Sequence, residues 1–449
     1  APPPTPAAAA LERLRGAVER FAALLADPIA ARFLVVTTPE PTVDAETRRL
    51  LARLRSEHVV VGGVIVNHFD PSAGAAPPDF GAVPVIVVPE LPGALTGPQA
   101  LRAFAAAAQC VGAASVARAH QESPLSAIPV AGVRIGGPYL PPLDRTLYVV
   151  GGKGGVGKST VAAALAVTLA DAHGGTVLLS TDPAGSLGDL FGVAVGEAAA
   201  AVPGAPGLTL RQVDAAAAWD AFRSDYHAEM EALFTAGASS SEADRAVAER
   251  LLELAPPGID ELMALADVID LGGAAAYNAL VLDTAPTGHL LRLLAMPAVA
   301  LDWTHALMRL LLRYREVIGL GETAGRLLEL ARRLRALQAR LADADRTLPL
   351  VVARPDALGV AESERLVPQL AALGLPAPVL LVNRLFAPDG TVPAARRAAA
   401  AQLLAIGGVM ERASAPELAS GPVGTQALRG FAGLWRRAEP AGRSTEALL

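Results

Sequence analysis

Short apolar runs alternate with longer helical patterns over the middle and the C-terminal part of the chain. The apolar runs have the length of buried strands, and they lie at Leu147–Val150, Thr176–Leu179, Ala279–Leu282, Leu350–Val352 and Val379–Val382. A helix is predicted at Ser159–Ala172, directly after the first of these strands. Strands that alternate with helices are typical of a parallel sheet with helices on both faces, so we predict an α/β fold.

Two longer segments, Asp214–Ile269 and Ala298–Leu341, have helical periodicity. They interrupt the alternation of strands and helices. We therefore predict a helical insert at about residues 214–341 of the α/β domain.

The chain also repeats part of itself. Positions 316 residues apart match without a gap, as in Val35 with Val351, Pro39 with Pro355 and Asn67 with Asn383. A second set, 327 residues apart, matches Pro89–Leu91 with Pro416–Leu418 and Gly97 with Gly424. We infer that residues 1–120 are a partial copy of the domain formed by residues 143–449, and that the Pro/Gly-rich residues 121–142 are a linker.

In the complete domain, a segment that contains the P-loop precedes the part that matches the first copy. The first copy has no counterpart of this segment before Ala1. The sequence also begins without methionine, which favours a start inside the first of two repeats. A natural, degenerate first repeat is the alternative, and both explanations remain open.

Composition excludes several classes of function. The 449 residues carry a net charge of −6 without a basic patch, which argues against a nucleic-acid partner. No apolar run is long enough for a membrane span. Cys110 is the only cysteine of the sequence, so no disulfide forms within it, and a reducing, cytoplasmic location is expected.

A phosphate-binding loop follows the strand Leu147–Val150. Residues 151–160, Gly-Gly-Lys-Gly-Gly-Val-Gly-Lys-Ser-Thr, satisfy G-x-x-x-x-G-K-[ST] between a strand and a helix, as a P-loop requires. Lys158 is expected to reach the β- and γ-phosphates of ATP, and the Ser159 hydroxyl to bind Mg²⁺. The loop residues expected to contact nucleotide are Gly152, Gly154, Gly155, Val156, Gly157, Lys158, Ser159 and Thr160.

Acidic residues follow two of the other predicted strands. Asp182 lies in Ser-Thr-Asp-Pro-Ala-Gly-Ser, and Asp283 lies in Asp-Thr-Ala-Pro-Thr-Gly-His. A carboxylate at the C-terminal end of a parallel strand beside a P-loop is placed to hold Mg²⁺ or its water. The pattern therefore predicts a Mg²⁺-dependent ATPase.

These motifs together resemble the ArsA family of ATPases. That family comprises the arsenical pump-driving ATPases and the ATPases that target tail-anchored membrane proteins. The resemblance covers residues 143–436, and residues 1–105 resemble the C-terminal part of a second such domain. Two halves in one chain are similar to the tandem arrangement of the arsenical pump ATPases.

The resemblance implies roles for four residues. Asp182 would polarise the attacking water, and Asp283 would support the Mg²⁺ shell through water. Asn383 would recognise the adenine edge. Lys153 belongs to a lysine-bearing variant of the P-loop, and it would contact nucleotide bound to a facing subunit. The implied assembly is an intrachain pseudo-dimer or a homodimer.

The partner is left undefined by the sequence. A three-thiolate site for arsenite cannot form with Cys110 alone. Trp303, Met308, Leu311 and Leu312 would line a client surface by resemblance to the targeting ATPases, or they pack in the core of the insert. We expect a protein client or a membrane pump as the partner of the nucleotide switch.

Two other functional classes are alternatives to this prediction. One is a spatial regulator of the MinD/ParA type, which the Asp283 motif and the helical insert disfavour. The other is a non-catalytic, nucleotide-dependent interaction module, which a turnover assay distinguishes from an ATPase.

Overall fold

The computed structural model consists of two compact units, residues 1–128 (unit 1) and residues 129–449 (unit 2). The structure describes all residues except 1–15, 17–18, 20, 22, 26, 28–30, 58, 70–75, 90–101, 103–104, 106, 112–132, 182–185, 197–198, 213–261, 263–276, 285–286, 314–320, 388–389, 419–420 and 441–449.

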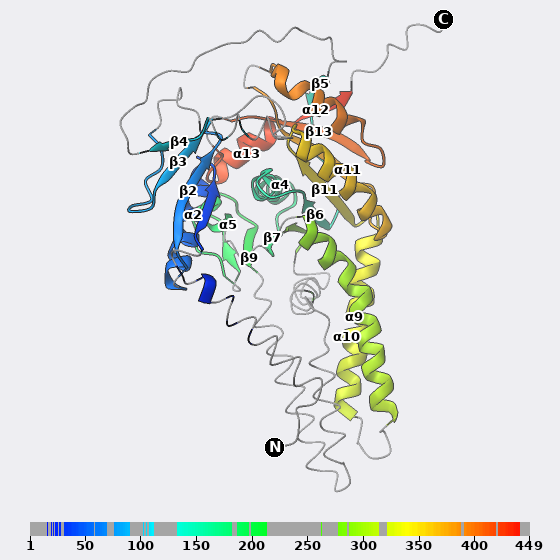
Figure 1. Cartoon of the computed structure of the whole chain (residues 1–449). Helices are drawn as coiled ribbons and strands as arrows, with labels where there is room; N and C mark the ends of the chain where they lie inside the picture. The colour runs from blue at the N-terminus through cyan, green and yellow to red at the C-terminus, as the bar shows by residue number, and fades with distance from the viewer. Residues whose placement is uncertain are drawn as a thin grey trace, which may run out of the picture. The chain divides into compact units, whose positions relative to one another are not determined.

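The described part of unit 2 contains a ten-stranded sheet with the order β5-β14-β13-β12-β11-β6-β10-β7-β9-β8 (Figure 1). From β13 to β9 all neighbouring strands are parallel, and antiparallel strands lie at both edges. The strands are β5 (Val133–Pro138), β6 (Leu147–Gly151), β7 (Thr176–Ser180), β8 (Ala200–Ala201), β9 (Leu208–Gln212), β10 (Ala279–Asp283), β11 (Thr347–Ala353), β12 (Val379–Phe386), β13 (Glu411–Pro416) and β14 (Arg436–Pro440).

Helices cover both faces of this sheet, and the predicted α/β class is confirmed (Figure 1). Alternate residues of a strand point to opposite faces, so Leu147 and Val149 of β6 belong to one core, and Tyr148 and Val150 to the other. The helices are α4 (Lys158–His173), α5 (Ser186–Phe191) and α13 (Thr425–Gly433) at the second core, and α9 (Thr287–Arg313), α10 (Gly321–Ala342), α11 (Ala357–Ala372) and α12 (Ala394–Ala405) at the first.

The predicted linker does not extend to residue 142. Residues 133–138 form the edge strand β5, which pairs antiparallel with β14, and Val133 and Ile135 pack against the core. The sequence pattern does not predict this strand, because it contains two glycines and a proline, which are depleted in strands. A sheet edge tolerates these residues. Tertiary pairing therefore decides the boundary of the domain.

The predicted helical insert is described only in part. The long helices α9 and α10 cover the described part of the predicted segment Ala298–Leu341, although α9 already begins at Thr287 and α10 ends at Ala342, and the two helices run side by side in Figure 1. Of the segment Asp214–Ile269, all but Leu262 lies outside the described residues. None of the helices that the structure describes combines the length and the apolar character that crossing a bilayer requires.

Unit 1 has the same strand order as the C-terminal part of the sheet of unit 2. Its described strands are ordered β1-β2-β3-β4, with β1, β2 and β3 parallel and β4 antiparallel, as in β11-β12-β13-β14. The elements are β1 (Phe33–Thr37), α2 (Pro41–Ser56), β2 (Val61–Asn67), β3 (Val85–Val88) and β4 (Gln109–Val111). Cys110 lies in β4.

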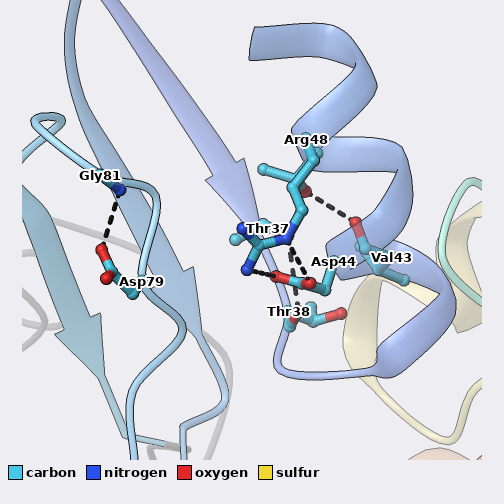
Figure 2. Close-up of polar contacts among 8 residues, drawn as sticks. Thr37, Thr38, Val43, Asp44, Arg48, Asp79 and Gly81 are labelled. Carbon is cyan, nitrogen blue, oxygen red and sulfur yellow. Dashed lines mark hydrogen bonds and ion pairs between the residues drawn. The ribbon is translucent and has the colours of Figure 1, made fainter. Parts of the chain in front are cut away.

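Polar contacts hold the beginning of α2 against the end of β1 (Figure 2). The buried hydroxyls of Thr37 and Thr47 share a hydrogen bond of 2.6 Å, and Thr47 also donates to the carbonyl of Val43. Arg48 donates to the carboxylate of Asp44 at 2.8 Å. Ser363 of α11, which lies 316 positions after Thr47, is also buried.

Candidate functional site

The predicted P-loop lies between β6 and α4, at the C-terminal edge of the parallel strands. Gly152, Gly155 and Gly157 have φ angles of 144°, 76° and 93°, in the region that side chains disfavour. The loop can therefore turn sharply enough for successive N–H groups to face one point. Gly157 is the N-cap of α4 and offers no side chain to the free N–H groups at the helix start, which suits binding of an anion.

Two of these glycines are also required by their neighbours. A Cβ on Gly152 would overlap the backbone carbonyl of Val352 on β11. A Cβ on Gly157 would overlap the side-chain amide of Asn383 on β12. The loop therefore packs directly against β11 and β12, two strands that lie far from it in the sequence.

We predict that Gly152→Ala lowers ATP turnover by more than about 100-fold, because the loop must move away from the carbonyl of Val352 and misplace its donors. Gly155→Ala is the matched comparison, since its Cβ would meet nothing within 4 Å and only the left-handed backbone opposes it. Phosphate release assays should rank Gly152→Ala well below Gly155→Ala. Equal losses would contradict the role of the Val352 contact.

Lys158 occupies the first position of α4 and is buried, with 7% of its surface exposed. Its Nζ atom donates to the carbonyl of Lys153 across the loop, at 3.3 Å. The ammonium is thereby held against the backbone of the loop, where the phosphates of a nucleotide would bring negative charge. Lys153, Ser159 and Thr160 are partly buried, and Gly154 and Gly155 lie on the exposed rim of the loop.

Asp283 ends β10, which pairs with β6 on one side and β7 on the other. It is fully buried, level with Val150 at the entrance of the P-loop and with Ser180 of β7. The next residue, Thr284, donates to the carbonyl of Val150 at 2.8 Å and ties the two strand ends together. A buried carboxylate fixed next to a phosphate loop is the kind of oxygen donor that a Mg²⁺ shell uses.

The start of α9 packs against the same loop. A Cβ on Gly151 would overlap the side chain of Leu290, so this helix approaches the backbone of β6 closely. The buried hydroxyls of Thr181 and Thr287 have no hydrogen-bond partner within the described structure. Thr284, Thr287 and Leu290 lie in or directly after the recognised Asp283 motif, but the sequence pattern predicts no site role for them individually.

Asn383 lies near the end of β12, is 5% exposed and contacts the P-loop. Its Nδ2 donates to the carbonyl of Val156 at 2.8 Å, and its Oδ1 accepts from the N–H of Arg384 at 3.0 Å. The predicted contact with an adenine edge is not tested by this geometry. What the structure does establish is that the residue holds the loop.

Other predicted residues are not brought to the site or are not described. Asp182 lies outside the described residues, two positions after the end of β7. Trp303 is partly buried and packs against the core of unit 2, and Met308 is partly buried. The side chains of Leu311 and Leu312 lie outside the described part, so a client surface stays a prediction.

The residues present fit ATP and Mg²⁺. The glycine loop offers backbone N–H groups and a buried ammonium to phosphates, while Ser159 and Asp283 offer oxygen ligands of the type Mg²⁺ prefers. When bound, Mg²⁺ would neutralise charge on the β- and γ-phosphates. Parallel sheet, P-loop and buried strand-end carboxylate define a P-loop nucleoside triphosphatase.

Comparison with known protein families identifies the ATPase family to which the chain belongs. The model of the family described as anion-transporting ATPase, ArsA, matches residues 145–436. The chain therefore belongs to this ATPase family, and the resemblance drawn from its motifs is confirmed. A regulator of the MinD/ParA type is accordingly disfavoured.

Three relatives illustrate the similarity. A putative arsenical pump-driving ATPase of Halobacterium salinarum is 33% identical over 240 residues, 54% of this chain and 35% of that protein. ATPase get3 of Aspergillus terreus is 31% identical over 262 residues, 54% of this chain and 74% of that protein. ATPase get3 of Aspergillus niger is 31% identical over 258 residues, 53% of this chain and 72% of that protein. The match thus spans about a third of the archaeal relative and about three quarters of the fungal ones.

Proposed function

We propose that the protein binds ATP with Mg²⁺ and hydrolyses it, and that hydrolysis drives a nucleotide switch coupled to a protein client or a membrane pump. The observation that carries the proposal is the arrangement of two buried charged side chains at the P-loop. Lys158 is buried against the glycine-rich loop, and Asp283 is buried at the end of the adjacent strand β10. Asp182 would orient the attacking water, and Ser159 and Asp283 would hold Mg²⁺. The cytoplasm is the proposed location.

The test of catalysis is phosphate release from ATP by the purified full chain. We expect turnover with Mg²⁺ and none after addition of EDTA, because the metal neutralises the charge that develops on the transferred phosphoryl group. Tight ATP binding without any phosphate release would instead support a non-catalytic interaction module.

A path from the site to a partner surface is available in the fold. Helix α9 begins four residues after Asp283, contacts Gly151 through Leu290 and pairs with α10 along its length. A change at the nucleotide phosphates would reach α9 through these contacts and move the helical pair. We propose that partners bind this helical part of unit 2.

Unit 1 is proposed to be a partial copy of the nucleotide-binding domain. The sequence matches and the shared strand order support this proposal. A further parallel is the left-handed residue that follows an asparagine of the second strand in each set. Asn67 accepts from the N–H of His68 at 3.1 Å as Asn383 does from Arg384, and His68 and Arg384 have φ angles of 58° and 56°.

Lys153 is proposed to act across an interface between two nucleotide sites. We predict that specific ATPase activity rises with protein concentration, and that Lys153→Ala abolishes the rise and leaves ATP binding largely intact. Lys158 already supplies charge in the ground state, so a second lysine that arrives on closure would stabilise mainly the transition state. A turnover number that stays constant over a wide dilution series, in both proteins, would contradict the proposal.

A further inference from the structure

The P-loop is held from outside by hydrogen bonds that start at Asn383. Its Nδ2 binds the carbonyl of Val156, the residue directly before the N-cap Gly157 of α4. Because both ends of the Asn383 amide are used, its orientation is fixed by Val156 on one side and Arg384 on the other. The position of Arg384 therefore controls the point at which the loop enters the helix.

Arg384 has a left-handed backbone with φ of 56°, a conformation that is unfavourable for a non-glycine residue. The same turn at Asn67–His68 in unit 1 indicates that the turn forms locally from an asparagine and the residue after it. In unit 2 the carbonyl of Arg384 also accepts a hydrogen bond of 2.8 Å from Nη1 of Arg396. The hydrogen bond from Arg396 therefore fixes the position of the left-handed residue Arg384, but it is not what makes this conformation form.

Arg396 lies in the first turn of α12, where the helix dipole disfavours a cation. Its second guanidinium nitrogen pairs with the carboxylate of Glu417 at 2.6 Å, with the Arg396 side chain only 14% exposed. The N–H of Glu417 in turn donates to the carbonyl of Phe386 at 2.8 Å. The Glu417 side chain is 36% exposed, so solvent shields the pair in part, and the charge-assisted hydrogen bond still links Arg396 of α12 to the ends of β12 and β13.

We propose that Arg396 is a positioning residue for the nucleotide phosphates, which acts through Arg384 and Asn383 on the P-loop. The proposal rests on the proposed function of ATP binding. Without Arg396, the turn at Arg384 can shift, the Asn383 amide no longer fixes the carbonyl of Val156, and the N–H groups at the start of α4 lose their alignment. The loss affects the phosphates, whatever base the nucleotide carries.

The experiment measures binding of mant-ADP to the full chain by fluorescence, and its displacement by inorganic tripolyphosphate, which has no base. Arg396→Ala and Asn383→Ala should each weaken both ligands about tenfold, equivalent to about 1.4 kcal/mol. The affinity of the double variant should equal that of the single variant with the lower affinity, because both substitutions disrupt the same series of hydrogen bonds. Arg397→Ala is the matched control, since the exposed Arg397 donates to the carbonyl of Val392, away from the loop, and it should bind as the wild type does.

Three results would overturn the proposal. They are unchanged affinities in Arg396→Ala, multiplicative losses in the double variant, and a loss of mant-ADP affinity that tripolyphosphate does not share. If Arg396→Ala does not fold, Arg396→Lys keeps a charge opposite Glu417, has a single nitrogen for two acceptors, and should still lose affinity for both ligands. Failure of the wild type to bind mant-ADP would contradict the proposed function itself.

Discussion

Replacement of Lys158 by alanine is expected to lower ATP turnover by at least about 100- to 1000-fold, the loss typical of one preorganised charge or donor at a transition state. The ammonium is buried at the start of α4 and is held by the carbonyl of Lys153. Alanine removes the only buried lysine charge of the described loop, so nucleotide affinity should fall as well.

Phosphate release and mant-ADP titration measure the two losses separately. Lys153→Ala is the matched control, because it removes a lysine from the same loop and should leave mant-ADP affinity largely intact. Turnover at the wild-type rate in Lys158→Ala would mean that residues 151–160 do not bind the reacting phosphates, and the site would have to be sought elsewhere.

Replacement of Asp182 by asparagine should keep ATP binding and lower hydrolysis by about 100-fold or more. Binding depends on the glycine loop and Lys158, which this change does not alter. Asp182 follows the end of β7, and β7 lies beside β10 with Ser180 level with Asp283. One strand, β10, separates β7 from β6, whose end leads into the P-loop. A carboxylate at position 182 can accept a proton from the attacking water, and an amide cannot.

Single-turnover hydrolysis and equilibrium nucleotide binding should be measured on the same Asp182→Asn preparation. Asp189→Asn in α5 makes the same chemical change seven residues further along and should leave both quantities near the wild-type values. If binding and hydrolysis fall together in Asp182→Asn, the residue has a structural or Mg²⁺-binding role instead.

Sequence patterns predicted the fold class and the position of the phosphate loop because both depend on local features. The apolar run at Leu147–Val150, the contiguous glycine motif and the helix after it are neighbours in the chain, and the structure has them as β6, the loop and α4. Asp283 was also predicted correctly at a strand end, since the run Ala279–Leu282 is short, apolar and bounded by turn residues.

The contacts that hold this loop come from distant parts of the chain, and only the tertiary structure decided them. Asn383 reaches Val156 over 227 positions of sequence because β12 and the P-loop meet at one edge of the sheet. The edge strand β5 has weak strand propensity, and it forms because β14 offers it a pairing partner. Local periodicity carries no information on such pairings, since they depend on which strands and helices the folded sheet places side by side.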